Sequence, residues 1–185
     1  VCKDRKVTME ETKSHDLPLI VQSDRTMLLD VHSPDANLCR DEIIAFSELV
    51  KAPEHIHTYA ISAISLWNAK SAGLSTEDIL VRLGRWSKFA VPQTVENYIQ
   101  DVSSRFGKLI LEPCLEEDYY RLRITDPFIA KAVQANQKVS KLLVPTLDCR
   151  SNSIRIHRYN RGDVKLALIK LGYPVDDRIP LVKSE

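Results

Sequence analysis

Residues 53–107 read PEHIHTYAISAISLWNAKSAGLSTEDILVRLGRWSKFAVPQTVENYIQDVSSRFG, and this stretch decides the fold because its elements have clear start and stop signals. A short strand is predicted over residues 55–61. A helix is predicted over residues 62–71, and Gly73 ends it because glycine readily adopts the left-handed backbone conformation found after helices.

Two further helices are predicted in the same stretch. Ser75 and Asp78 have the spacing of a capping box, in which a hydroxyl and a carboxylate satisfy the free N–H groups of a helix start. Pro92 favours the first turn of a third helix, over 92–106, because its missing N–H would have no partner there.

Two β-rich runs follow, KLILE at 108–112 and YYRLRI at 119–124, and a polar turn separates them. Three helices followed by a two-stranded hairpin is the element order of a winged helix, whose third helix often binds a partner. The predicted fold class is therefore α+β, with a winged-helix-like three-helix core and a β-hairpin wing.

Elements are also predicted on both sides of this core. We expect a β-hairpin at 17–22 and 26–31, a helix at 34–51, a helix at 127–143, a strand at 153–157 and a helix at 164–171. The predicted organisation is a flexible N-terminal arm at 1–16, a winged-helix-like domain at 17–145, a small strand–helix appendage at 146–177 and a truncated linker at 178–185.

The composition of the 185 residues is that of a globular protein, with 44% hydrophobic and 28% charged residues. A net charge of +1 is low for a dedicated nucleic-acid binder, so any DNA contact must come from local basic patches. No apolar run has the length of a membrane span. The four cysteines are scattered, which favours reduced thiols in a cytoplasmic protein over disulfides or a zinc site.

Basic side chains in three places are the candidate nucleic-acid-binding residues. Residues 150–165 contain the largest group, opposed only by Asp163, and the others lie on the second helix and the 119–124 strand. The candidates are Arg150, Arg155, Arg158, Arg161, Lys165, Arg82, Arg85, Lys88, Arg121 and Arg123. Such runs can contact phosphates without reading sequence. The alternative is that these side chains are solvated or paired with the acidic residues at 116–118.

The outward side chains of the third helix are candidates for partner binding. They include Gln93, Asn97, Gln100 and Arg105, whose amide and guanidinium groups could read base edges. The helix nevertheless carries more acidic than basic side chains, and a negative surface repels phosphates. We therefore expect protein docking, or a plain solvated face, rather than insertion into a DNA groove.

No catalytic or metal site is predicted. His55 and His57 would point to the same side of a strand, but nearby residues offer too few further ligands for a tetrahedral site. Trp67 and Trp86 lie at helical spacing with leucines, which indicates core positions. No arrangement of Ser, Cys or His indicates nucleophilic catalysis.

Several short sequence segments, which follow one another along the chain, resemble the N-terminal region of the XPB-type (xeroderma pigmentosum B-like) DNA repair helicases, the bacterial branch in particular. The most specific are LIVQSD at 19–24, HIHTYAIS at 55–62, SLWNAKSAGL at 65–74 and LGYP at 171–174. The resemblance implies that two motor domains of a larger protein hydrolyse ATP and unwind DNA with 3'-to-5' polarity. It also implies that residues 150–177 lead into a damage-recognition element.

The chain itself has no G-x-x-x-x-G-K-[ST] sequence to hold phosphates. We therefore expect a non-catalytic accessory domain without a cofactor, with ATP and Mg bound only in the missing motor domains. The expected partners are fork or duplex DNA and either the protein's own motor domains or a repair protein, in the bacterial cytoplasm at the nucleoid and not at a membrane. The alternatives are a free-standing winged-helix transcription regulator and a pure protein-interaction scaffold.

Overall fold

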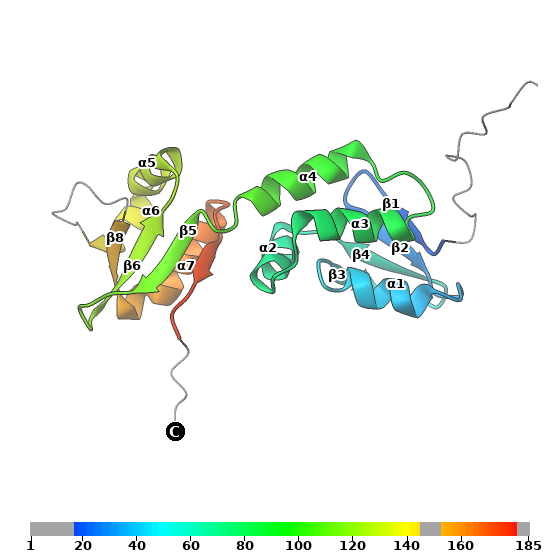
Figure 1. Ribbon diagram of the computed structural model, residues 1–185, viewed down its shortest axis with the longest axis horizontal. Helices are drawn as coiled ribbons and strands as arrows, with labels where there is room; N and C mark the ends of the chain where they lie inside the picture. Colours follow the sequence, from blue (N-terminus) through cyan, green and yellow to red (C-terminus); the bar gives the residue numbers. More distant parts are fainter. Residues whose placement is uncertain (1–16, 145–152, 181–185) are drawn as a thin grey trace, which may run out of the picture. The chain divides into compact units, whose positions relative to one another are not determined.

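The computed structural model describes residues 17–144 and 153–180, and the chain divides into two compact units at Ser103/Ser104. Each unit contains one β-sheet with helices against it (Figure 1). The predicted α+β class is confirmed. The predicted arm at 1–16 lies outside the described residues.

The first unit is built on a four-stranded antiparallel sheet. Its strands are β1 (Leu19–Val21), β2 (Thr26–Asp30), β3 (Glu48–Lys51) and β4 (Ile56–Ala60), in the order β1-β2-β4-β3. Pairing of Leu19 with Leu29 and of Met27 with Tyr59 brings large apolar side chains to one face, where they are buried. The predicted hairpin at 17–22 and 26–31 is β1–β2.

Local capping explains where the helices of this unit begin. They are α1 (Ala36–Ile43), α2 (Ala63–Ser71), α3 (Thr76–Trp86) and α4 (Gln93–Ser104). Ser62 forms a capping box with Ser65 at α2, and Ser75 forms one with Asp78 at α3. Hydrogen bonds from the Ser75 hydroxyl and N–H lower the pKa of Asp78. Gly73, between the two helices, has a φ of +93°, as its predicted role requires.

Helix α4 packs its apolar side into the first unit. Val95, Ile99 and Val102 are buried, and the indole Nε1 of Trp67 donates a 2.9 Å hydrogen bond to the carbonyl of Val102. The predicted core position of Trp67 is confirmed. Gly107, which follows α4 with a φ of +79°, confirms the predicted stop.

The second unit contains a five-stranded sheet with one parallel pair. Its strands are β5 (Leu109–Pro113), β6 (Tyr119–Ile124), β7 (Leu143–Val144), β8 (Ser153–His157) and β9 (Val175–Asp177), in the order β7-β8-β6-β5-β9. Its helices are α5 (Pro127–Ala135), α6 (Gln137–Ser140) and α7 (Arg161–Lys170). Leu111, Leu122 and Ile156 from the sheet form a core with Val133 and Leu168 from the helices.

The predicted winged-helix-like core is not what the structure forms. The β5–β6 hairpin lies in the middle of the second sheet, whereas the three helices before it belong mainly to the first unit. The hairpin takes this place because β8 and β9 supply backbone partners on its two sides. The division also falls inside the predicted domain 17–145, and the segment predicted as an appendage contributes β8 and α7 to the second core.

Three predicted boundaries are wrong. The helix predicted over 34–51 ends with α1, and Glu48–Lys51 forms β3 instead, because its backbone pairs with β4. The helix predicted over 127–143 is divided at Asn136, whose side chain caps the N–H groups that begin α6. In the segment predicted to be irregular after residue 174, Val175–Asp177 forms β9, and Ile179 is buried.

Asp177 ties β9 to α7. Its side chain is 11% exposed and accepts hydrogen bonds from Lys165 Nζ at 2.7 Å and Arg161 Nε at 3.0 Å. Burial opposes ionisation of Asp177, but hydrogen bonds from Lys165, the Ile179 N–H and Arg161 outweigh it, so the pKa of this carboxyl lies below its usual value. A lowered pKa contributes stability at neutral pH, and this contribution is lost as the pH falls through that pKa.

Changing Asp177 to Asn should lower the free energy of unfolding by about 2 kcal/mol at pH 7, because two charge-assisted hydrogen bonds are weakened. The deficit relative to the unchanged chain should shrink below about pH 4, where carboxylates are protonated. Urea unfolding followed by far-UV circular dichroism measures both. Asp176→Asn is the control, because Asp176 pairs with the more exposed Arg178 and should contribute less than about 1 kcal/mol. Equal effects of the two changes would contradict the role of Asp177.

Candidate nucleic-acid interface

The face of the second sheet that points away from its apolar core carries polar side chains from β6 and β8. Antiparallel pairing sets Tyr119 opposite His157 and Arg121 opposite Arg155. The alternate residues, such as Leu122, belong to the core. Because side chains alternate between the faces of a sheet, these four side chains share the other face.

Arg121 and Arg155 place two positive charges directly across from each other. Like charges in this position destabilise a strand pair unless anions compensate them. Arg155 Nη1 forms a 2.9 Å ion pair with Glu116, a residue of the β5–β6 turn. The side chain of Arg121 is exposed and forms no hydrogen bond or ion pair with any residue that the structure describes. On β5, Glu112 lies opposite Arg121, but its carboxylate pairs with Arg123. The Arg121 guanidinium therefore has no direct ion pair among the described residues and could contact a phosphate.

Three rings form a ladder beside these arginines. The ring centroid of His157 lies 4.6 Å from that of Tyr119 and 4.8 Å from that of Tyr159, and the planes of His157 and Tyr159 are 13° from parallel. The guanidinium of Arg155 lies 5.3 Å from the centroid of Tyr119. We call Tyr119, His157 and Tyr159 the ring ladder. Its outer member, Tyr159, is 77% exposed.

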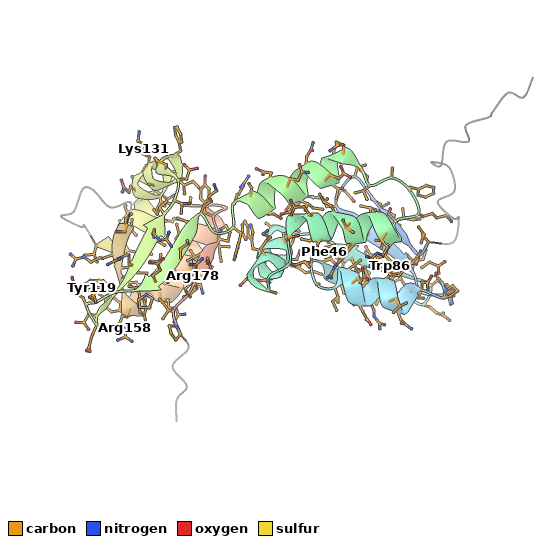
Figure 2. The ribbon with its side chains drawn as sticks, viewed as in Figure 1. Phe46, Trp86, Tyr119, Lys131, Arg158 and Arg178 are labelled. Carbon is orange, nitrogen blue, oxygen red and sulfur yellow. The ribbon has the colours of Figure 1, made fainter. Side chains whose placement is uncertain are left out.

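The side chain of Arg158 forms hydrogen bonds at the end of the sheet where the ring ladder lies. It donates from Nη1 to the carbonyl of Glu117 at 2.9 Å and from Nε to Tyr120 Oη at 3.3 Å. The hydrogen bond to Tyr120 raises the pKa of the exposed Arg158 guanidinium above its usual value. Figure 2 shows Tyr119 and Arg158 at one end of the second unit, and Lys131 on helix α5 at another. We use the name basic–aromatic face for Arg121, Arg155 and the ring ladder, together with Arg158, which lies at the same end of the sheet but contacts Tyr120 on the core side.

The other predicted basic residues have partners within the fold. Arg161 and Lys165 pair with Asp177, Arg123 pairs with Glu112, Arg85 pairs with Glu42, and Arg82 donates to the carbonyl of Glu42. The backbone N–H of Lys88 donates to the carbonyl of Leu19, and its side chain is half-buried. Arg150 lies outside the described residues. Of the predicted set, Arg121, Arg155 and Arg158 lie together at one end of the second sheet, where Arg121 and Arg158 are exposed and Arg155 is half-buried.

Three of the four predicted partner-binding residues lie on one helix of the first unit. Gln93, Asn97 and Gln100 are exposed along α4, and Gln93 Nε2 donates to Asn97 Oδ1 at 3.0 Å. Arg105 follows α4 and belongs to the second unit, where a Cβ on Gly172 would lie 3.1 Å from Arg105 Nη1. The first three residues remain candidates for docking on α4, and the role of Arg105 stays a prediction.

Of the two histidines considered as metal ligands, His55 contacts another histidine. His55 Nδ1 lies 2.8 Å from His32 Nε2, so one ring donates a hydrogen bond to the other. Within residues 17–144 and 153–180, no three His, Cys, Asp or Glu side chains are grouped as a metal site would require. None of the described helices has both the length and the apolar character that crossing a membrane requires.

A hollow of about 570 Å³ in the second unit lies away from the basic–aromatic face. It is lined by α6 and α7, including Asn136, Lys138, Asp163 and Lys170. None of the predicted site residues lines it. This hollow therefore does not define the candidate site.

Tyr119 and Tyr159 are the candidate residues that sequence reasoning missed. The alternation of Tyr119 with Arg121 and Arg123 was visible in the sequence, but the partner strand β8 was not. Pairing β6 with β8 is the step that would have placed His157, and then Tyr159, beside Tyr119.

Known proteins match almost the whole chain. Residues 19–148 match the protein family described as helicase conserved C-terminal domain. A "DNA 3'-5' helicase XPB" from Kineococcus radiotolerans is 38% identical over 92% of this chain, and one from Mycobacterium tuberculosis is 37% identical over 92%. A yeast relative, "General transcription and DNA repair factor IIH helicase/translocase subunit XPB/SSL2", is 38% identical over 50% of this chain and 11% of its own length. The chain spans 30% of the length of each of the two bacterial relatives.

The Glu42 carboxylate, which links α1 to α3, should contribute to the free energy of unfolding. Glu42 accepts from Arg85 Nη1 and from the indole of Trp86, both at 2.9 Å, and its side chain is 28% exposed. Glu42→Ala should lower the free energy of unfolding by about 1–2 kcal/mol, measured by urea unfolding with tryptophan fluorescence. Asp41→Ala is the matched control, since its pair with Arg40 is exposed. A decrease no larger than that of the control would contradict a structural role for Glu42.

Proposed function

The chain belongs to the helicase conserved C-terminal domain family and is of the XPB type, and on that basis we propose that it is a non-catalytic N-terminal accessory part of an ATP-dependent 3'-5' DNA helicase that acts in repair. The carrying observation is that 92% of the chain aligns with bacterial XPB helicases of which it spans 30%. A segment of that share contributes one part of the function of a larger protein.

In this proposal, ATP and Mg are bound by motor domains outside this chain. A phosphate-binding loop of the Walker type needs two glycines five residues apart, followed by Lys and Ser or Thr. The five glycines of this chain, the first at Gly73 and the last at Gly172, never have that spacing. The chain would therefore position DNA or the motor, and the motor would hydrolyse ATP.

DNA contact is proposed for the basic–aromatic face. Arg121 and Arg155 lie opposite each other, and a phosphate between them would relieve their repulsion. The carboxylate that pairs with Arg155, Glu116, is 53% exposed in the β5–β6 turn. A partner so exposed contributes little to stability and can be exchanged for a phosphate. Arg158 adds a third cation at the same end of the sheet.

Protein docking is proposed for the exposed side of α4. Gln93, Asn97 and Gln100 can exchange hydrogen bonds with a partner, and Glu96 and Asp101 make this helix unsuited to phosphates. The partner would be the protein's own motor domains or a repair protein at the nucleoid of the bacterial cytoplasm. The alternative of a free-standing winged-helix regulator has no support from the fold, because the hairpin and the three helices do not form one unit.

Reversing charge on the basic–aromatic face should weaken binding to forked DNA. Arg121, Arg155 and Arg158 changed together to Glu should lower the affinity at least tenfold at 50 mM salt, and the salt slope should fall by about one for every phosphate that the variant no longer neutralises. Fluorescence anisotropy over a series of salt concentrations measures both. Lys131, Lys138 and Lys141 changed to Glu make the control, because these exposed lysines on or next to α5 and α6 give the same change in net charge.

Equal decreases in affinity of the two triple variants would contradict specific binding by this face. ATP turnover by the purified chain alone would contradict the accessory role.

In a pull-down with the motor half of a bacterial relative, Gln93→Glu together with Gln100→Glu should abolish capture of the partner if α4 is the docking surface. Circular dichroism establishes that each variant is folded.

A further inference from the structure

We propose that the ring ladder stacks on the unpaired bases of a nucleic-acid strand, so that the second unit binds single-stranded DNA in preference to duplex. This inference rests on the proposed DNA contact and specifies the form of DNA that is bound. It follows from the geometry of Tyr119, His157 and Tyr159, and from the balance of charge around them.

The outer two rings of the ladder are stacked as neighbouring bases are, whereas Tyr119 is tilted by 36° from His157. His157 lies between two tyrosine rings at centroid distances of 4.6 and 4.8 Å, and it is nearly parallel to Tyr159. Tyr159 is 77% exposed. Aromatic rings attract a further π-system in offset stacking, and every base presents such a face. A base could therefore extend the ladder only after it has left its own duplex.

The ladder does not serve the core of the unit. Helices α5, α6 and α7 contribute to the apolar core, and the face that carries Tyr119 and His157 is the opposite one. Tyr120, the neighbour of Tyr119, packs against that core, as a structural tyrosine on this strand would. Tyr159 is instead held outward by a short 3₁₀ turn (Arg158–Asn160), whose first N–H donates to the carbonyl of Asp118 at 3.0 Å. The backbone that carries the exposed ring is thus held in place, which reduces the entropy that binding would cost.

The local charge favours bases over phosphates as the main contact. Around the ladder, Arg121, Arg123, Arg155 and Arg158 are balanced by Glu112, Glu116, Glu117 and Asp118. Duplex DNA offers mainly phosphates to a surface that does not enter its grooves, so a balanced surface gains little from it. An unpaired strand offers its bases as well. Arg155, above Tyr119, can then orient the strand through a single phosphate.

The test uses three labelled oligonucleotides of equal length: a run of thymidines, the same backbone without bases, and a duplex. The unchanged chain should bind the thymidine strand more tightly than the other two, measured by fluorescence anisotropy. Tyr159→Ala should weaken binding of that strand by about fivefold to a hundredfold, which is the effect of removing one base stack. Tyr159→Phe should restore the affinity, because the ring remains. Phe128→Ala is the control, since this aromatic on α5 is 82% exposed.

The outcomes separate the two proposals. Unchanged affinity in Tyr159→Ala, or equal affinity for the strands with and without bases, overturns stacking. If the Arg121, Arg155 and Arg158 triple variant then still fails to bind forked DNA, the proposed function stands without the ladder. If no oligonucleotide binds even at low salt, both proposals fail, and a protein becomes the occupant of this face.

Discussion

Two-sided pairing of β5 is the constraint on which the second unit depends. The backbone of Leu109–Pro113 pairs antiparallel with β6 and parallel with β9, so it lies in the interior of the sheet. Leu109 and Leu111 are fully buried between this sheet and its helices. A parallel neighbour cannot be reached by a tight turn, so the chain must pass through α7 before β9 returns to β5. The ion pairs of Asp177 hold that return in place.

The elements that the sequence predicts well are those whose signals are local. Ser75 and Asp78 lie three residues apart and determine the start of α3 without help from the rest of the chain. The hairpins β1–β2 and β5–β6 also join neighbouring segments. The errors occur where distant segments pair. ELVK at 48–51 continues a helical pattern in the sequence, yet β4 draws it into a sheet, and Val175–Asp177 becomes a strand only because β5 offers an edge.

The candidate site shows the same limit at the level of side chains. The sequence displays the basic residues of 150–165 and their possible partners at 116–118, of which Glu116 does pair with Arg155, but it does not display the carboxylate that pairs with Arg161 and Lys165. Arg161 and Lys165 form ion pairs with Asp177, which lies in a segment predicted to be irregular. The opposition of Arg121 and Arg155, and the contact of Tyr119 with His157, exist only because β6 pairs with β8. The group of residues is therefore a product of tertiary structure, although each member was visible in the sequence.

The distance along the chain between β5 and β9 has a consequence for biosynthesis. As the polypeptide leaves the ribosome, the first unit has all its strands once Ala60 has emerged, and α4 completes it soon afterwards. In the second unit, one backbone edge of Leu109–Pro113 has no partner until Val175–Asp177 has also emerged. An apolar strand with an open edge can pair with other chains. Nascent copies on one messenger RNA are therefore most prone to association during that interval, and a chaperone that shields strand edges would act on this unit rather than on the first.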